Sequence, residues 1–261
     1  MAIVTLLSDS GDRDFYVAAV KARILSINPG IRIEDISHHV LSGNIAHAAF
    51  VLRSVYREFP KGTVHLVGVD SVGRPGDGHI AIHLDDHYFV GPNNGILSLL
   101  APERQPSQLA TLNTIIPVNT TFPERDILAP AAARLASGVS LSDLGRPSGS
   151  FKRLTDRHFK ATKKQILGHV IHIDFYGNLI TNIQKDIFDQ IVGGRNFTVQ
   201  FGSERSNRIN TDYHQAEPGD SFLLFNSLGL LEIGICYGNA NQLLGLGFDS
   251  PVNILFDDSG I

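Results

Sequence analysis

The sequence predicts an α/β protein with two domains: an N-terminal α/β domain with a mostly parallel sheet, and a C-terminal all-β domain that forms a small barrel or sandwich. Over residues 1–100, apolar runs of strand length alternate with segments whose apolar residues recur at helical spacing. Beyond residue 167, short strands separated by Gly-rich turns dominate. A stretch rich in Gly, Pro, Ser and basic residues lies between them. We therefore place the domains at 1–145 and 167–261, joined by a linker at 146–166.

The N-terminal domain begins with a continuous apolar run, which is typical of a strand buried in a parallel sheet. Helical periodicity follows and ends at Asn28-Pro29-Gly30, a strong helix stop. The same alternation continues, and Gly138 is expected to end the last helix. The predicted strands are 2–7, 32–36, 63–70, 79–84 and 88–90, and the predicted helices are 15–27, 45–59 and 126–137, with a short helix after the turn at 93–95.

The C-terminal domain contains short apolar segments bounded by turn residues, which favours antiparallel strands. The predicted strands are 168–174, 196–201, 221–225, 230–235 and 252–256.

Composition excludes several classes of protein. The chain has 22 basic and 26 acidic residues, a net charge of -4, and this balance argues against nucleic-acid binding. The basic residues between 152 and 164 fit a solvated linker. The single cysteine, Cys236, lies in an apolar run and is expected to be a buried hydrophobe. Neither a signal peptide nor a membrane span is apparent, so we expect a cytoplasmic protein.

Two aspartates, Asp9 and Asp70, follow predicted strands of the N-terminal sheet. Ligands of parallel sheets bind beyond the carboxyl ends of the strands. A carboxylate there can accept hydrogen bonds from two hydroxyl groups, such as those of a ribose. The alternative is that each aspartate caps the helix that follows it.

The Gly-rich loop at 71–79 matches neither the phosphate loop nor the dinucleotide-binding pattern, so it is interpreted as a flexible loop lining a pocket. The 11 histidines lack the spacing of a metal site, and no metal is expected.

Three polar turns stand beside strands of the C-terminal domain, at 173–182, 226–232 and 238–241. A Gly-Asn turn is ordinary hairpin chemistry. Carboxylate, phenol and amide groups around one turn could also hold a planar base and an ammonium group. Backbone beside Gly and Ala can approach a flat ring closely.

These segments, in this order, resemble the S-adenosylmethionine hydroxide adenosyltransferase family, which is related to the fluorinase and chlorinase enzymes. The matching segments span nearly the whole chain: TLLSDSGDRDFYVAAVKARIL (5–25), IEDISHHV (33–40), FPKGTVHLVGVD (59–70), HYFVGPNNGILS (87–98), TFPERDILAPAAARLASG (121–138), VIHIDFYGNLITNI (170–183) and NSLGLLEIGICYGNANQLLGL (226–246).

The resemblance implies a homotrimer that binds S-adenosylmethionine as substrate between subunits, at an N-terminal domain of one and a C-terminal domain of its neighbour. It implies that Asp9 holds the ribose diol, that Asp70 lies near the sulfonium and the nucleophile, and that Phe122 lines the ribose pocket. It further implies roles for residues of the C-terminal domain. Asn178, Asn239 and Ala240 would recognise the adenine, with Tyr176 against its face, and Asp174, Ser227 and Glu232 would face the methionine end or neighbouring polar groups.

The family reaction is displacement at the 5′ carbon of the ribose, with neutral methionine as the leaving group. No acid is required, because a sulfonium departs without a proton; the reaction needs an aligned, desolvated nucleophile. When that nucleophile is water, the family uses an Asp-Arg-His set. Asp70 matches its aspartate, and Arg74 is the candidate for its arginine. The family pattern is TFHGRD, and this chain reads TFPERD at 121–126, so Pro123 stands where the family has histidine. Glu124 or His79 is a candidate to replace that histidine.

The expected function is hydrolysis of S-adenosyl-L-methionine to adenosine and L-methionine, without a cofactor. Two alternatives remain. One is a non-catalytic protein that binds S-adenosylmethionine or adenosine, which the loss of the histidine favours. The other is a halogenating relative that uses chloride, and Asp70 argues against it because a carboxylate repels an anion.

Overall fold

The computed structural model describes residues 2–74, 76–112, 120–155 and 159–257. The chain divides into two compact units, Met1–Asp156 and Arg157–Ile261. Each unit is described by itself below. None of the helices in the described ranges combines the length and the hydropathy that crossing a bilayer requires.

The first unit contains a seven-stranded sheet in the order β2-β1-β3-β5-β4-β6-β7. Its strands are β1 (Ile3–Ser8), β2 (Arg32–Ser37), β3 (Val64–Gly68), β4 (His79–Leu84), β5 (His87–Pro92), β6 (Gln108–Leu112) and β7 (Gly145–Pro147). Strands β2, β1, β3 and β5 pair in parallel, whereas β5-β4, β4-β6 and β6-β7 pair antiparallel. The sheet is therefore mixed, which corrects the prediction of a mostly parallel one.

The antiparallel half of this sheet begins at the turn between β4 and β5. Asp85 and Asp86 both have positive φ, 53° and 63°. Two successive residues of this kind form a tight hairpin whose twist matches that of the strands. The chain consequently returns as β5 directly beside β4, instead of crossing over through a helix. Strands β6 and β7, which the sequence did not predict, extend the sheet from there, and β7 lies at the start of the predicted linker.

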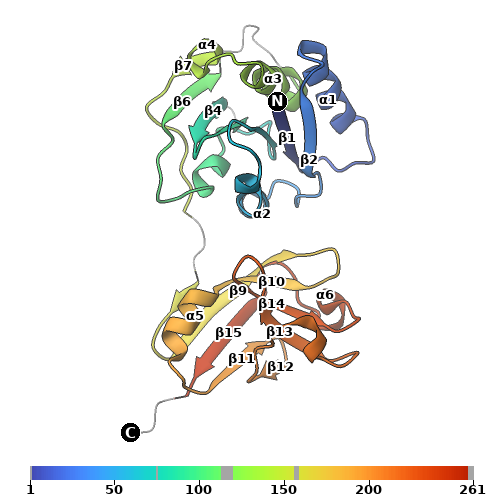
Figure 1. The fold of residues 1–261 in the computed structure, drawn as a ribbon, viewed down its shortest axis with the longest axis vertical. Helices are drawn as coiled ribbons and strands as arrows, with labels where there is room; N and C mark the ends of the chain where they lie inside the picture. The colour runs from blue at the N-terminus through green and yellow to red at the C-terminus, as the bar shows by residue number, and fades with distance from the viewer. Residues whose placement is uncertain (1, 75, 113–119, 156–158, 258–261) are drawn as a thin grey trace. The chain divides into compact units, whose positions relative to one another are not determined.

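Helices cover both faces of this sheet (Figure 1). They are α1 (Tyr16–Ile27), α2 (Ile45–Arg53), α3 (Ala129–Ala136) and α4 (Leu141–Leu144), with 3₁₀ helices η1 (Tyr56–Glu58) and η2 (Ile96–Leu99) and the π-helix η3 (Glu124–Leu128). Leu6 packs with α1 and α3, whereas its neighbour Leu7 packs with α2 and η2. This alternation explains why the strand is apolar at every position.

Two predicted helices differ from those observed. The segment 45–59 divides into α2 and η1, and the segment 126–137 starts earlier, with η3. Pro130, at the start of α3, cannot donate a hydrogen bond to the carbonyl of Asp126, and a π turn lies at that place. Gly138 ends α3 as predicted, with φ of 92°.

The second unit contains an antiparallel sheet in the order β12-β11-β15-β9-β10-β14-β13, with β8 paired to β9. Its strands are β8 (Lys160–Ala161), β9 (Gln165–Ile173), β10 (Leu179–Gln184), β11 (Phe197–Phe201), β12 (Glu204–Ser206), β13 (Ser221–Phe225), β14 (Leu230–Ile235) and β15 (Pro251–Phe256). A bridge between Asn210, beyond β12, and Leu224 of β13 connects the two ends of this order, so the sheet is nearly a barrel.

Helices α5 (Lys185–Val192) and α6 (Ala240–Leu243) accompany this sheet, so the prediction of an all-β domain is incomplete. Phe188 of α5 is buried in the core of the unit, where it meets Phe197, Phe225 and Phe256. The sequence did not predict α5, β10 or β12, and β8 lies within the predicted linker.

Candidate functional site

A pocket opens in the first unit where β1 and β3 end. It is lined by residues of β1, α1, β3 and η3 and by residues next to β1, β2 and η3: Leu6, Leu7, Ser8, Ser10, Tyr16, Val17, Val20, His38, Leu66, Phe122 and Glu124. The ring of Phe122 meets Tyr16 edge-on at 5.2 Å between centroids. The wall is thus aromatic, and hydroxyl, imidazole and carboxyl groups stand among the apolar side chains.

Asp9 and Asp70, the two aspartates predicted at the strand ends, come together at this edge of the sheet. The Asp9 carboxylate accepts a hydrogen bond from the Gly43 amide at 2.8 Å and a longer one, at 3.5 Å, from the Asp70 amide. Its contacts are therefore with loop backbone, and neither caps α1. The Asp70 side chain is exposed to solvent.

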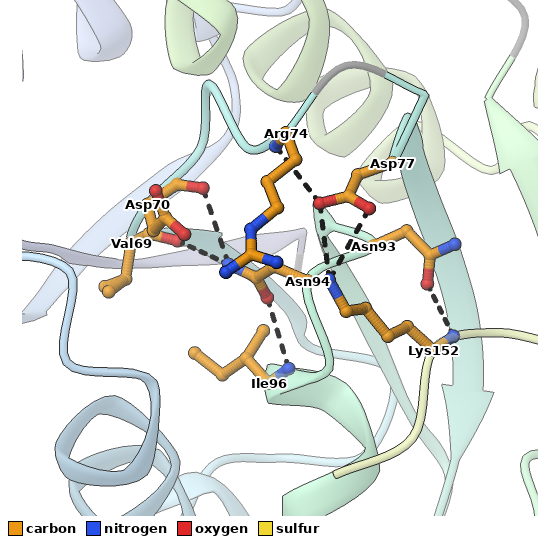
Figure 2. A network of polar contacts seen from close by, with 8 residues as sticks. All are labelled: Val69, Asp70, Arg74, Asp77, Asn93, Asn94, Ile96 and Lys152. Atoms are coloured by element: carbon orange, nitrogen blue, oxygen red, sulfur yellow. Dashed lines mark hydrogen bonds and ion pairs between the residues drawn. The ribbon is translucent and has the colours of Figure 1, made fainter.

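Asp70 adopts a left-handed backbone conformation, with φ of 48°. Aspartate is one of the few residues that tolerates this conformation. Asn94, which is buried, anchors it: its side-chain amide donates to the carbonyls of Val69 at 3.0 Å and Asp70 at 3.4 Å, while its oxygen accepts from the Ile96 amide (Figure 2). This anchor sets the direction in which the Asp70 carboxylate leaves the strand.

Arg74 lies in the loop that follows Asp70. The Arg74 amide donates to the Asp77 carboxylate at 3.1 Å, and Lys152 forms an ion pair with the same carboxylate at 3.4 Å. The Lys152 backbone amide also donates to the Asn93 side chain at 2.8 Å, so Lys152 connects the loop to the turn between β5 and η2 (Figure 2). In the described part of the chain, no hydrogen bond or ion pair joins the Arg74 side chain to Asp70.

Glu124 begins η3 and lines the pocket beside Phe122. The Ser71 hydroxyl is within hydrogen-bonding reach of its carboxylate. Burial raises the pKa of Glu124; the Ser71 contact opposes that shift, and the nearby Asp9 adds to it. Its neighbour Pro123 is buried and has no titratable group. The carboxylate in this pocket therefore has a higher proton affinity than an exposed glutamate.

A second cluster forms in the other unit, around the turn between β9 and β10. Asp174 accepts hydrogen bonds from the backbone and side-chain amides of Asn178, at 2.8 and 3.1 Å. Gly177 lies directly against the side chain of Asn239, and its carbonyl accepts from the Asn241 amide at 3.0 Å. The turn that carries Asn178 is thus brought against Asn239, the N-cap residue of α6, although the two predicted asparagines are far apart in sequence.

Glu232, in β14, is buried, and its exposed fraction is only 3%. It accepts hydrogen bonds from the Tyr213 hydroxyl and the Asn226 side chain, each at 3.1 Å, and Asn178 is within reach. Burial raises the pKa of Glu232, and these hydrogen bonds oppose the shift. Sequence reasoning missed Tyr213, because no pattern links its segment to β14.

The other predicted residues of this unit differ in exposure. Ala240 is buried at the start of α6, whereas Ser227 and Tyr176 are exposed on turns. Tyr176 and its neighbour Phe175 have exposed fractions of 75% and 98%. Two adjacent aromatic side chains left in solvent mark a surface suited to binding. Within the residues that the structure describes, no group of three or more His, Cys, Asp or Glu side chains could hold a metal ion.

The fold and the two clusters define a two-domain α/β protein with an aromatic-walled pocket at the carboxyl edge of its first sheet. Comparison with known families specifies it further. The model of the SAM hydroxide adenosyltransferase N-terminal domain matches residues 4–145, and that of the C-terminal domain matches residues 168–253. The chain therefore belongs to the S-adenosylmethionine hydroxide adenosyltransferase family.

Relatives match the chain over nearly its full length. A protein of Thermus thermophilus named (R)-S-adenosyl-L-methionine hydrolase is 32% identical, over 98% of this chain and 100% of its own. A Methanocaldococcus jannaschii protein of the same name is 30% identical, over 97% of this chain and 96% of its own. A fluorinase of an Actinoplanes species is 26% identical, over 70% of this chain and 72% of its own. A crystal structure from Thermotoga maritima, described as an uncharacterized conserved protein, superposes with a TM-score of 0.87 at 30% identity, over 97% of this chain and 99% of that one.

Proposed function

We propose that this protein hydrolyses S-adenosyl-L-methionine to adenosine and L-methionine, by attack of water at the 5′ carbon of the ribose. Its similarity to two (R)-S-adenosyl-L-methionine hydrolases over nearly the whole of each chain is the observation that carries this proposal. The pocket at the ends of β1 and β3 supports it, because its aromatic wall and its polar groups suit a nucleoside.

In this proposal Asp9 binds the ribose hydroxyls, Phe122 lines the ribose pocket, and Asp70 and Arg74 orient the attacking water. The hydrogen bond from the Asp70 amide to the Asp9 carboxylate, which brings both residues to one sheet edge, supports these roles. Asn178, Asn239 and Ala240 recognise the adenine edge and Tyr176 covers its face, while Asp174, Ser227 and Glu232 bind the methionine end. The contacts among Asp174, Asn178 and Asn239 support the second set.

We further propose that the protein acts in the cytoplasm as a homotrimer with its sites between subunits, and that it uses no cofactor or metal. The exposed Phe175 and Tyr176 support an assembly, since large aromatic side chains are seldom left in water.

Incubation of the purified protein with S-adenosylmethionine, with and without chloride or fluoride, tests the proposal directly when the products are separated by chromatography. Adenosine and methionine should form in equal amounts and in proportion to enzyme, whether or not halide is present. A 5′-halogenated nucleoside would favour the halogenating alternative. Intact substrate together with tight binding measured by calorimetry would favour a non-catalytic binder. Pro123 motivates this test, because it stands where the family has its histidine and cannot transfer a proton.

A further inference from the structure

Glu124 differs from the other residues that line the pocket. Among the lining residues that the structure describes, it is the one carboxylate, and it stands between the aromatic wall at Phe122 and the end of β3. Pro123 stands where the family pattern has its histidine, and Glu124 is the next residue. A titratable group therefore remains in this region of the pocket, on the neighbouring residue.

Two separate contacts fix the position of the Glu124 side chain. Gly68, the last residue of β3, leaves room for it, because a β-carbon at that position would collide with the Cγ atom of Glu124. The Ser71 hydroxyl is within hydrogen-bonding reach of the carboxylate from the loop beyond β3. The carboxylate is thus held beside the strand end that carries Asp70.

Charged and titratable groups surround Glu124 on several elements. Tyr16 in α1 and His38 after β2 line the pocket with it, and the charge of Asp9, after β1, acts on it. Asp70 precedes Ser71 in the loop after β3, and Arg125 and Asp126 follow Glu124 in η3. Arg125 and Asp126 form an ion pair with each other at 2.7 Å. His38 hydrogen bonds Ser8 at 2.7 Å and approaches Asp35 at 3.2 Å. Neither Arg125 nor His38 therefore neutralises Glu124, and the negative charge of Asp9 favours its protonated form.

His79, the other candidate substitute for the missing histidine, has a different task. Its Nε2 atom hydrogen bonds the Ser71 carbonyl at 3.0 Å. Burial lowers the pKa of His79, and this contact opposes the shift. The imidazole thus supports the loop that carries Ser71, while Glu124 lines the pocket.

We propose that Glu124 is a catalytic residue of this site and accepts the proton of the attacking water; this proposal rests on the function proposed above. The water oxygen forms a bond to the 5′ carbon, and the bond from that carbon to sulfur breaks, with its electron pair staying on sulfur. Methionine leaves neutral, and the water proton passes to the Glu124 carboxylate and then to solvent. A base works best when its pKa approaches the working pH, and burial moves Glu124 in that direction.

The test compares four full-length proteins: the natural chain, Glu124→Gln, Glu124→Asp and the control Glu58→Gln, which changes an exposed glutamate in η1. For each, kcat and KM for S-adenosylmethionine are measured from pH 4 to 9, and binding of adenosine is measured by calorimetry. Adenosine is used because it is neutral. Unlike S-adenosylmethionine it has no sulfonium charge that a carboxylate could attract, so loss of the Glu124 charge should not change its affinity.

We expect Glu124→Gln to lower kcat by about 100-fold or more, the usual contribution of a general base, and to remove the acidic limb of the pH profile. Its affinity for adenosine should match that of the natural chain. Glu124→Asp should keep part of the activity together with an acidic limb, and Glu58→Gln should behave as the natural chain.

Three results would overturn the assignment. If Glu124→Gln keeps the natural kcat and acidic limb, then Glu124 is not the base, although the hydrolase function stands. If Glu124→Gln loses turnover and adenosine binding together, its role is structural. If the natural chain binds adenosine but forms no product at any pH, both the proposed function and the role of Glu124 are wrong.

Discussion

Gly68 and Glu124 are complementary in shape: a β-carbon built on Gly68 would lie 2.7 Å from the Cγ atom of Glu124. Gly68 does not have a positive φ, so its backbone does not require glycine. Glycine is required at position 68 because the Glu124 side chain packs against its α-carbon. This contact joins the end of β3 to the start of η3, two segments that both border the pocket.

Replacing Gly68 with alanine should therefore displace Glu124 without straining the backbone. We expect kcat for S-adenosylmethionine to fall by about 10-fold or more, because small misplacements of a reacting group cost large factors in rate. Steady-state kinetics on Gly68→Ala measures this. Gly149→Ala is the matched control, since a β-carbon at Gly149 meets nothing within 4 Å. Equal rates in the two variants would contradict the importance of this contact.

Asp70 offers a second prediction, because its side chain and its left-handed backbone can be tested separately. Asn tolerates this conformation about as well as Asp, whereas Ala does not. Asp70→Asn should lose about 100-fold or more in kcat if the carboxylate orients water, with adenosine binding and thermal stability unchanged. Asp70→Ala should lose the same activity and also unfold at lower temperature. Turnover that survives in Asp70→Asn would show that the nucleophile site has been assigned to the wrong residue.

A third prediction concerns acid stability and rests on His65, which is buried in β3. Its Nδ1 atom lies 2.7 Å from the Thr5 hydroxyl and its Nε2 atom 3.1 Å from Nδ1 of His87. Burial lowers the pKa of His65 to about 3, and His87 adds to the effect. The folded state thus holds the neutral ring, and its stabilising effect is complete above the ordinary pKa of 6.5. As the pH falls from there towards 3, folding loses up to about 1.4 kcal/mol per pH unit.

Chemical denaturation at a series of pH values measures this loss. In His65→Asn the free energy of unfolding should decrease less steeply between pH 6 and 4 than in the natural chain. His214→Asn, which alters an exposed histidine of the second unit, is the control and should keep the natural slope. Parallel slopes in all three proteins would contradict the assignment to His65.

The sequence specifies much of this fold, because burial leaves a periodic signal. The apolar run at the start of the chain matches β1, and the predicted strands 79–84, 221–225 and 230–235 have the bounds of β4, β13 and β14. The sequence does not predict strand β10, because its polar residues also suit a binding turn. In the structure Thr181 is buried and donates to the Leu231 carbonyl. Helix α5 has apolar residues on one face but is short and lies among strands.

The sequence predicts less of the candidate site than of the fold, because the contacts of the site join segments that are distant along the chain. The positions of Asp9 and Asp70 follow from the rule for strand ends, and the structure brings them together. Nothing local indicates that Asn94 supports Asp70 or that Gly68 makes room for Glu124, since each contact depends on how two elements pack. The roles of these residues in binding and turnover stay predictions until the variants are measured.

The last prediction concerns a variant in which a histidine at position 123, as in the family pattern, replaces Glu124 as the proposed base. In the double variant Pro123→His with Glu124→Gly, an imidazole takes over the proton and the glutamate is removed. We expect turnover to be retained, with the acidic limb of the pH profile now near the ordinary histidine pKa of about 6.5. Pro123→His alone should show no loss of adenosine binding, which calorimetry reports. A double variant that folds and binds adenosine but is inactive would contradict the idea that one proton acceptor replaces the other, because the two bases would then occupy different places relative to the 5′ carbon.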